Sequence, residues 1–136
     1  MAVSSDTVQA VKAAIDAWIR SVEGGTLDLL PAVVAQDPDL VWIGGGEADW
    51  LVGYDALKQA MRAQNEALQE IKISVSDETI HVSLSEDLAW ATNRWVFRAK
   101  MAGQEVAFPL RCTWVLQKRD TGWVLVHWHK SLAMAE

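Results

Sequence analysis

Apolar residues recur at steps of three and four positions near the start of the chain, which is the spacing of one face of a helix. Ser4, Ser5 or Asp6 can cap such a helix, and the glycine pair at 24–25 can end it. The pattern therefore predicts a first helix over residues 4–24. Its apolar face comprises Val8, Val11, Ile15, Trp18 and Val22.

Two further helices and a small hairpin are predicted between residues 26 and 68. A short helix begins near residues 26–28, carries Pro31 in its first turns and stops before Asp37. Residues 40–43 form a short strand, and residues 49–52 return as its hairpin partner after three glycines. A third helix opens at residues 53–55. One of its faces carries Leu57, Ala60, Met61, Gln64 and Leu68.

From residue 71 onward the hydrophobic period changes from that of a helix to that of a strand. The predicted strands cover residues 71–84, 88–99, 106–118 and 122–131, with an irregularity at 76–78 and a turn at 102–103. Pro109 predicts a bulge or an edge position near the start of the third of these strands.

Three helices and a hairpin followed by four long strands are typical of the α+β class with an antiparallel sheet. A meander of this length must curve, and we expect the helices to cover its concave side. The chain of 136 residues is expected to form one domain, 1–136.

Composition restricts the partners and the compartment. The net charge of −6 argues against binding to nucleic acid or to an anionic membrane. The single cysteine, Cys112, excludes an internal disulfide and is interpreted as a small core residue. No run approaches the roughly 20 apolar residues of a membrane span, and no export signal is visible at the start of the chain, so a cytoplasmic protein is expected.

Three segments resemble the SnoaL-like members of the nuclear transport factor 2-like superfamily. They are residues 53–57 (GYDAL), 111–115 (RCTWV) and 123–131 (WVLVHWHKS). The last is also similar to the end of the association (hub) domain of calcium/calmodulin-dependent kinase II. The resemblance implies a cone-shaped, cystatin-like α+β fold and leaves the activity open, because the superfamily hosts isomerases, cyclases, hydrolases, binding proteins and oligomerisation hubs.

One activity of these relatives is excluded by the residues themselves. The resemblance places the catalytic tyrosine of ketosteroid isomerase-like members at Trp18 and their general-base aspartate at Trp42. An indole N–H is a donor only and cannot act as a base. The isomerase mechanism is therefore not expected by this route.

Arg94 and Lys130 are the candidate ligand-binding cations. The resemblance aligns both with basic pocket residues of the hub domain and aligns a third such position with Trp114. Strand alternation groups Arg94 with Trp90, Trp114 with Cys112, and Lys130 with Trp128 on one face. These residues, with Trp42 and Trp50, predict a tryptophan-walled pocket for a small acidic or aromatic molecule. The alternative is that Arg94 pairs with a carboxylate such as Asp16 or Glu47 and that Lys130 is solvated.

His127 and His129 are weak candidates for catalysis, since they lie two residues apart on one strand face. A metal site would need a third ligand that the sequence does not place beside them. They can also serve as a base, as a hydrogen-bonding pair or as structural histidines. No cofactor and no metal are predicted, because no phosphate loop, dinucleotide fingerprint or thiol-metal spacing is present.

The outer face of the predicted sheet carries a large apolar patch, which a monomer rarely leaves in water. We therefore expect a homodimer through this convex face. The patch comprises Trp95, Phe97, Arg111, Thr113, Val115, Trp123 and Leu125.

Three functions stay open from the sequence. The first is binding of a small organic molecule in the cone. The second is an enzyme of hydrolase, isomerase or lyase type that uses Arg94 with His127 or His129. The third is an oligomerisation module without chemistry.

Overall fold

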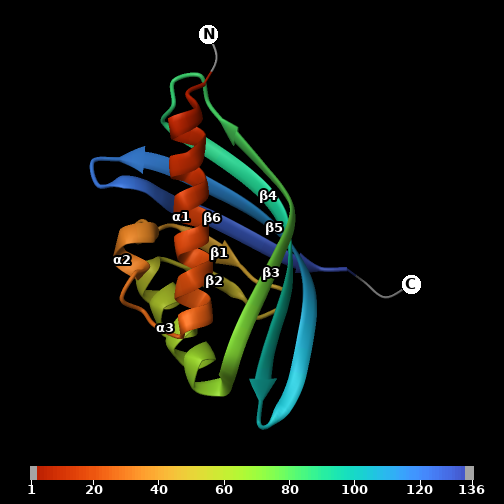
Figure 1. Cartoon of the computed structure of the whole chain (residues 1–136). Coiled ribbons are helices and arrows are strands. Elements are labelled where there is room, and N and C mark those ends of the chain that lie inside the picture. Colours follow the sequence, from red (N-terminus) through yellow and green to blue (C-terminus); the bar gives the residue numbers. More distant parts are fainter. Residues whose placement is uncertain (1–2, 134–136) are drawn as a thin grey trace.

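A computed structural model describes residues 3–133 of the chain. The order of elements follows the expected succession of helices and then strands (Figure 1). The elements are α1 (Ser5–Gly24), α2 (Leu30–Val33), β1 (Val41–Ile43), β2 (Trp50–Val52), α3 (Tyr54–Ala67), β3 (Leu68–Val82), β4 (Leu88–Met101), β5 (Gln104–Arg119) and β6 (Gly122–Leu132). The α+β class is confirmed.

Helix α1 has the ends that the sequence predicts. The side chain of Ser4 accepts a hydrogen bond from the Asp6 amide at 3.1 Å, and Gly25 ends the helix in the left-handed conformation. Its apolar stripe is buried against one face of the sheet, with Ile15 and Trp18 almost inaccessible to solvent. None of the helices within residues 3–133 is long and apolar enough to cross a membrane.

The six strands form one sheet in the order β2-β1-β6-β5-β4-β3. All neighbouring strands are antiparallel except β1 and β6, which run parallel, so the sheet is mixed and the expectation of an antiparallel sheet is wrong at this pair. By pairing with β6, β1 covers an edge that would otherwise leave backbone groups of β6 unpaired. Strand β6 is therefore central, as its apolar composition indicates.

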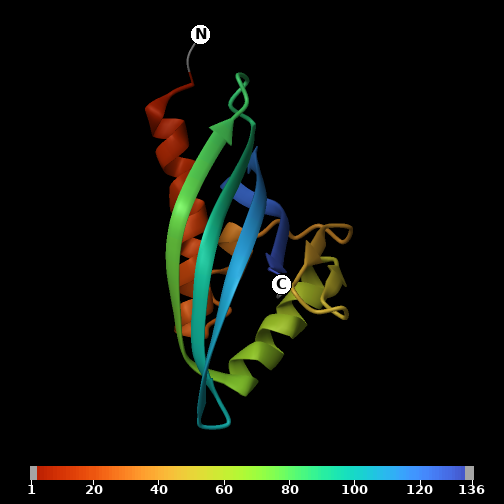
Figure 2. The same cartoon turned by 90° about the vertical axis from the view of Figure 1, so that its right-hand side faces the viewer.

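The long strands bend around α1, so that the helices occupy the concave side of the sheet (Figures 1 and 2). Strand β3 is interrupted between Ser76 and Thr79, as expected, and Asp77 has a positive φ of 53° there. Pro109 lies in β5 just before the residues that pair with β6, so at that point β5 has a neighbour only in β4. The predicted edge position of Pro109 is confirmed.

Tryptophan fills much of the concave side. The ring of Trp128 lies between 5.1 and 5.9 Å, centroid to centroid, from four other indoles: Trp18, Trp42, Trp95 and Trp114. Such tilted and edge-on contacts are the geometries that aromatic rings prefer. The core of the cone is thus packed with indole rings, and any hollow must lie beside this cluster.

Candidate ligand-binding site

Lys130 is a charged residue that lies beside the tryptophan cluster on the concave side. It follows Trp128 on the inward-facing side of β6, and its strand partner on β5 is Cys112. Its Nζ lies 5.2 Å from the centroid of the Trp128 ring, within the range of a cation–π contact. The lysine therefore extends from the tryptophan cluster toward α3.

Two hollows meet at this lysine, and both are walled in part by α3 and the β1–β2 loop. Their volumes are about 230 and 250 Å³. They share three residues, Asp49, Gln64 and Lys130. The other residues of the inner hollow are Trp42, Gly44, Leu51, Leu57, Ala60, Met61 and Trp128. Those of the outer hollow are Gly45, Gly46, Leu68, Phe97, Phe108, Leu110 and Leu132.

The surroundings of Lys130 disfavour its charge. Burial lowers the pKa of Lys130 below the ordinary lysine value, and the negative charge of Asp49 offsets this only in part. Lys130 forms no ion pair with a carboxylate of residues 3–133. Burial raises the pKa of the Cys112 thiol to about 12, so this neighbour is neutral at physiological pH and supplies no counter-charge. The site is a cation held in apolar walls without a direct partner.

Asp49 is held in place by the glycine-rich turn between β1 and β2. Its carboxylate accepts a hydrogen bond from the Gly46 amide at 2.9 Å, and its backbone carbonyl accepts one from the Gly44 amide at 2.7 Å. A Cβ at position 44 would lie only 2.6 Å from the Cβ of Asp49, so the turn requires glycine there. The sequence analysis predicted a hairpin here but did not place the Asp49 carboxylate near Lys130, where its charge acts on the lysine.

Three of the predicted site residues come together in this region: Trp42, Trp128 and Lys130 all line the inner hollow. Trp114 contacts Trp128 at 5.3 Å but is fully buried in the core and lines neither hollow. Trp50 lies on the edge strand β2 and is 63% exposed. Gln64, on the predicted apolar face of α3, was not proposed as a site residue.

The predicted grouping of Arg94 and Trp90 with Trp114 is wrong. Arg94 lies opposite Arg111 on the outer face, where its side chain is 67% exposed and pairs with Asp77 at 3.2 Å. Trp90 is 43% exposed on the same face. The cause is the register of the β4–β5 hairpin, whose two-residue turn at 102–103 places Ala91, not Thr92, opposite Trp114.

The outer face is polar where a large apolar patch was expected. Trp95, Phe97 and Leu125 are buried in the core, whereas Arg111 and Thr113 are exposed. A shift in the β5–β6 register next to Val126 brings Leu125 and Trp128 onto the same inward face, although strict alternation would separate them.

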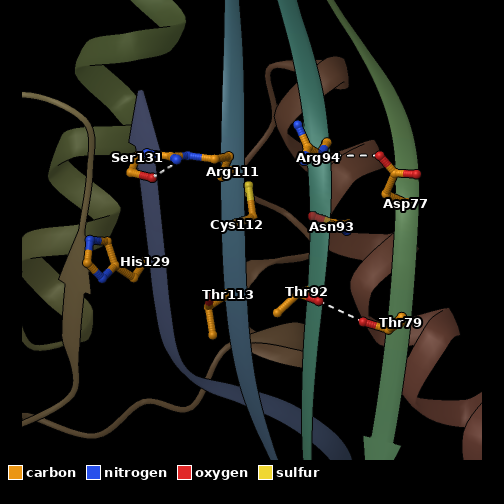
Figure 3. Close-up of a pocket in the computed structure, with 10 residues that line it drawn as sticks. All are labelled: Asp77, Thr79, Thr92, Asn93, Arg94, Arg111, Cys112, Thr113, His129 and Ser131. Atoms are coloured by element: carbon orange, nitrogen blue, oxygen red, sulfur yellow. Dashed lines mark hydrogen bonds and ion pairs between the residues drawn. The ribbon is translucent and has the colours of Figure 1, made fainter. Parts of the chain in front are cut away.

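A shallow depression of about 480 Å³ lies on this outer face (Figure 3). Thr79 and Thr92 share a hydrogen bond across β3 and β4, and Arg111 donates to the Ser131 hydroxyl at 3.2 Å. Arg94 and His129 both line the depression, so two of the three residues suggested for an enzyme share one surface. The remaining lining residues are Asp77, Asn93, Cys112 and Thr113.

His127 and His129 do not act as a pair. Nδ1 of His127 lies 2.7 Å from the carbonyl oxygen of Val41 and thereby ties β6 to β1, whereas His129 is exposed on the outer face. Within residues 3–133 no group of three potential ligands is arranged to hold a metal ion.

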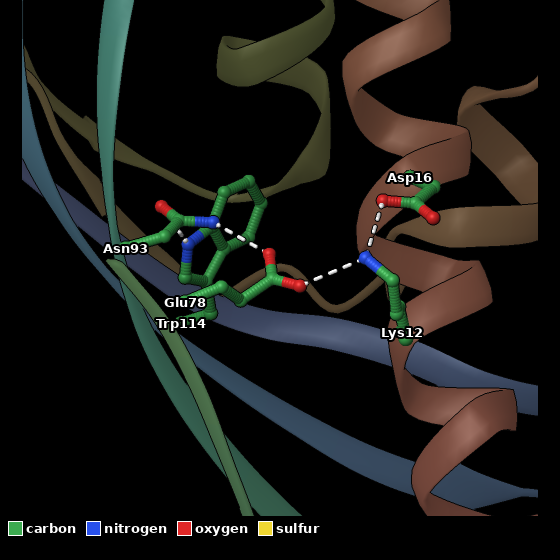
Figure 4. Close-up of polar contacts among 5 residues, drawn as sticks. All are labelled: Lys12, Asp16, Glu78, Asn93 and Trp114. Carbon is green, nitrogen blue, oxygen red and sulfur yellow. Dashed lines mark hydrogen bonds and ion pairs between the residues drawn. The ribbon is translucent and has the colours of Figure 1, made fainter. Parts of the chain in front are cut away.

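A row of hydrogen-bonded side chains, called the polar chain below, lies at the other end of the concave side (Figure 4). The Trp114 indole N–H donates to Asn93 Oδ1 at 3.0 Å, and Asn93 Nδ2 donates to Glu78 at 3.0 Å. Glu78 also accepts from Lys12 of α1 at 2.9 Å. This chain occupies the part of the cone where the sequence predicted a pocket with Arg94. No sequence signal predicts it, since Asn93 is one polar residue in a strand of alternating polar and apolar residues.

The comparisons with known proteins agree with the observed fold. The sequence profile of the SnoaL-like domain matches residues 11–135. No curated protein matches the sequence significantly.

Among solved structures, the chain resembles a nuclear transport factor 2-like superfamily protein from Salmonella enterica, with a TM-score of 0.87, 20% identity, and coverage of 98% of this chain and 95% of that one. It also resembles a protein with a cystatin-like fold from Caulobacter vibrioides, with a TM-score of 0.78, 16% identity, and coverage of 96% and 92%.

A third similar structure is the CaMKII hub of S. rosetta, with a TM-score of 0.75, 23% identity, and coverage of 92% of this chain and 95% of that one. At these identities the structural matches establish the fold, while the profile match covers most of the chain. The protein therefore belongs to the family of SnoaL-like domains.

Proposed function

We propose that the protein binds a small organic molecule with an aromatic or aliphatic body and one acidic group, in the two hollows that meet at Lys130. The observation that carries this proposal is a partly buried cation, without an ion-pair partner among residues 3–133, between two mostly apolar cavities. A buried charge is costly unless an opposite charge compensates it. An anionic ligand group would supply that charge, and the apolar walls would contact the rest of the ligand.

A second feature of the inner hollow supports a ligand with an acceptor atom. The indole N–H of Trp128 is buried and has no oxygen or nitrogen acceptor within the described part of the chain; the only acceptor beside it there is the Cys112 sulfur, which accepts weakly. Buried donors are normally satisfied. Trp128 lines the same hollow as Lys130, so an acceptor group bound there would be close to both.

Binding of benzoate tests the proposal, with uncharged benzamide as the comparison ligand. We expect benzoate to change the tryptophan fluorescence, because Trp42 and Trp128 line the inner hollow. Lys130→Met should weaken benzoate binding at least about tenfold, which corresponds to about 1.4 kcal/mol. Lys72→Met removes an exposed lysine from β3 and is the matched control, which should bind as the wild type does. Equal binding of benzoate and benzamide, or unchanged binding by Lys130→Met, would refute an anion-binding role.

We also propose that the outer face of the sheet pairs with a second copy of the chain. The support differs from the apolar patch that the sequence suggested. Trp90 is half-exposed, and its ring centroid lies 5.4 Å from that of His81, on which it stacks; a row of threonines beside it forms a β-branched surface. Asp77 and Arg111 lie on the same face, so two copies related by a two-fold axis can pair opposite charges.

A further inference from the structure

Among residues 3–133, Lys130 is the only lysine that lines the two hollows. Its neighbours there are mostly aliphatic and aromatic side chains, together with the amide of Gln64 and the carboxylate of Asp49. An amine in such a place is exposed to small molecules that enter the hollow and is shielded from bulk water. A lysine in an apolar pocket is the setting in which its nitrogen becomes a nucleophile toward carbonyl groups.

The other lysines with a shifted pKa are held in the charged form. Lys12 contacts Glu78 at 2.9 Å and Lys100 contacts Glu70 at 2.8 Å, and these hydrogen bonds raise the pKa of each amine. Burial acts in the opposite direction on Lys130 and lowers its pKa. At a given pH a larger fraction of Lys130 therefore has a free lone pair.

We propose that Lys130 condenses reversibly with small aromatic aldehydes that occupy the hollows and forms an imine with them. The proposal rests on the binding function above, because the aldehyde must enter the same space as the acidic ligand. It adds a covalent step to a site that would otherwise only bind.

The step is balanced without a cofactor. The lone pair of the neutral Lys130 nitrogen attacks the carbonyl carbon, and the π electrons of the carbonyl bond move to its oxygen. The oxygen then leaves as water with the two hydrogens that began on the nitrogen, and a carbon–nitrogen double bond replaces the carbon–oxygen one. Hydrolysis reverses the step, and nothing is oxidised or reduced.

The polar residues shared by the two hollows fit this reaction. The amide N–H of Gln64 can donate a hydrogen bond to the carbonyl oxygen and so polarise it. Asp49 stabilises a protonated imine by its negative charge, as it already favours the charged form of Lys130. Both residues line both hollows together with the lysine.

Borohydride trapping tests the proposal. The protein is mixed with benzaldehyde at pH 8, reduced with sodium borohydride, weighed intact by mass spectrometry and mapped by peptides. The expected result is one benzyl group on Lys130. Lys130→Arg keeps a cation but lacks a nucleophilic amine at this pH, and it should lower the labelled fraction at least about tenfold. Lys72→Met should be labelled as the wild type is. Lys130→Met is a second variant that tests the site if the arginine does not fit.

The outcomes separate this proposal from the binding function. Labelling spread over the exposed lysines, or labelling of Lys130→Arg to the wild-type level, would overturn the imine. Failure to form an adduct in a protein that binds benzoate would overturn the imine and leave the binding function intact. If neither an adduct nor benzoate binding is found, both proposals fail.

Discussion

Lys130 is a residue whose burial costs stability. Burial lowers the pKa of Lys130 in the folded protein. At pH values below this folded pKa, the folded and unfolded chains both carry the proton on Lys130, so the full free-energy cost of burying the charge is present. Between the folded pKa and the ordinary value of 10.5, the unfolded chain still holds the proton that the folded chain has lost, so the free energy of unfolding rises with pH. Above pH 10.5 the amine of Lys130 is neutral in both states, and the free energy of unfolding rises no further from this group.

The first prediction concerns Lys130→Met. We expect this variant to raise the free energy of unfolding at pH 7 by roughly 1–2 kcal/mol, because it removes an uncompensated buried charge. The difference from the wild type should shrink as the pH rises toward 10.5. Urea unfolding of both proteins at several pH values between 7 and 10 measures this difference in the free energy of unfolding. A difference that stays constant over this range would show that Lys130 is solvated in the folded state.

Asn93 is buried for a different reason, since it bridges two partners. It accepts from the Trp114 indole and donates to Glu78. Asn93→Ala leaves the Trp114 N–H unsatisfied in the core, and we expect it to lower the free energy of unfolding by about 2–3 kcal/mol. The neighbouring strand offers a control in Gln104→Ala, an exposed substitution at the start of β5 and outside the threonine row, with an expected change within about 0.5 kcal/mol. Similar midpoints for the two variants in urea would show that the polar chain contributes little.

At the scale of single residues, the sequence showed which side chains are unusual but not what they touch. It singled out Lys130 and the tryptophans by type and spacing. It could not show that Asp49 faces Lys130, because these residues lie far apart in the chain and only the pairing of β1 with β6 brings them together. Asn93 escaped notice because a buried asparagine and an exposed one look alike in an alternating strand.

At the scale of elements, register decided the site. The turn at 102–103 has two residues with positive φ, which is the geometry of a tight hairpin turn. This turn sets Arg94 opposite Arg111, and the sequence analysis had already placed Arg111 on the outer face. Pairing the two strands across a two-residue loop thus predicts that Arg94, like Arg111, lies on the outer face and does not point into the cone. The shift next to Val126 has no such signal in the sequence.

The β1–β2 hairpin provides a prediction at this scale. Gly44→Ala would place a Cβ 2.6 Å from the Cβ of Asp49, so the turn must open and Asp49 must move away from Lys130. We expect at least about a threefold change in benzoate affinity and a loss of roughly 1 kcal/mol in stability. In Gly24→Ala, at the end of α1 and outside both hollows, the new Cβ would make only an ordinary contact at 3.7 Å with Thr26, so this variant should resemble the wild type. Calorimetric titration of both variants makes the comparison, and equal affinities would argue that Asp49 has no part in binding.

At the scale of the whole molecule, self-association through the outer face is the feature to test. Trp90→Glu adds a charge beside the threonine row, where a partner would have to bury it. We expect it to convert a dimer of the wild type into a monomer without unfolding the chain, as measured by analytical ultracentrifugation and circular dichroism. Trp50→Glu, on the edge strand β2, is the matched control and should leave the dimer intact. A wild type that sediments as a monomer at micromolar concentration would refute the interface.

The sequence by itself determined the succession of helices and strands, the α+β class and the family. These depend on periodicities of two and 3.6 residues and on caps and turns, which are local properties of the chain. Tertiary contacts decided that the sheet is mixed, that the β5–β6 register shifts next to Val126, and that the hollow lies beside Lys130. A side chain's face reverses with a register change of one residue, and such a change is set by contacts between distant strands.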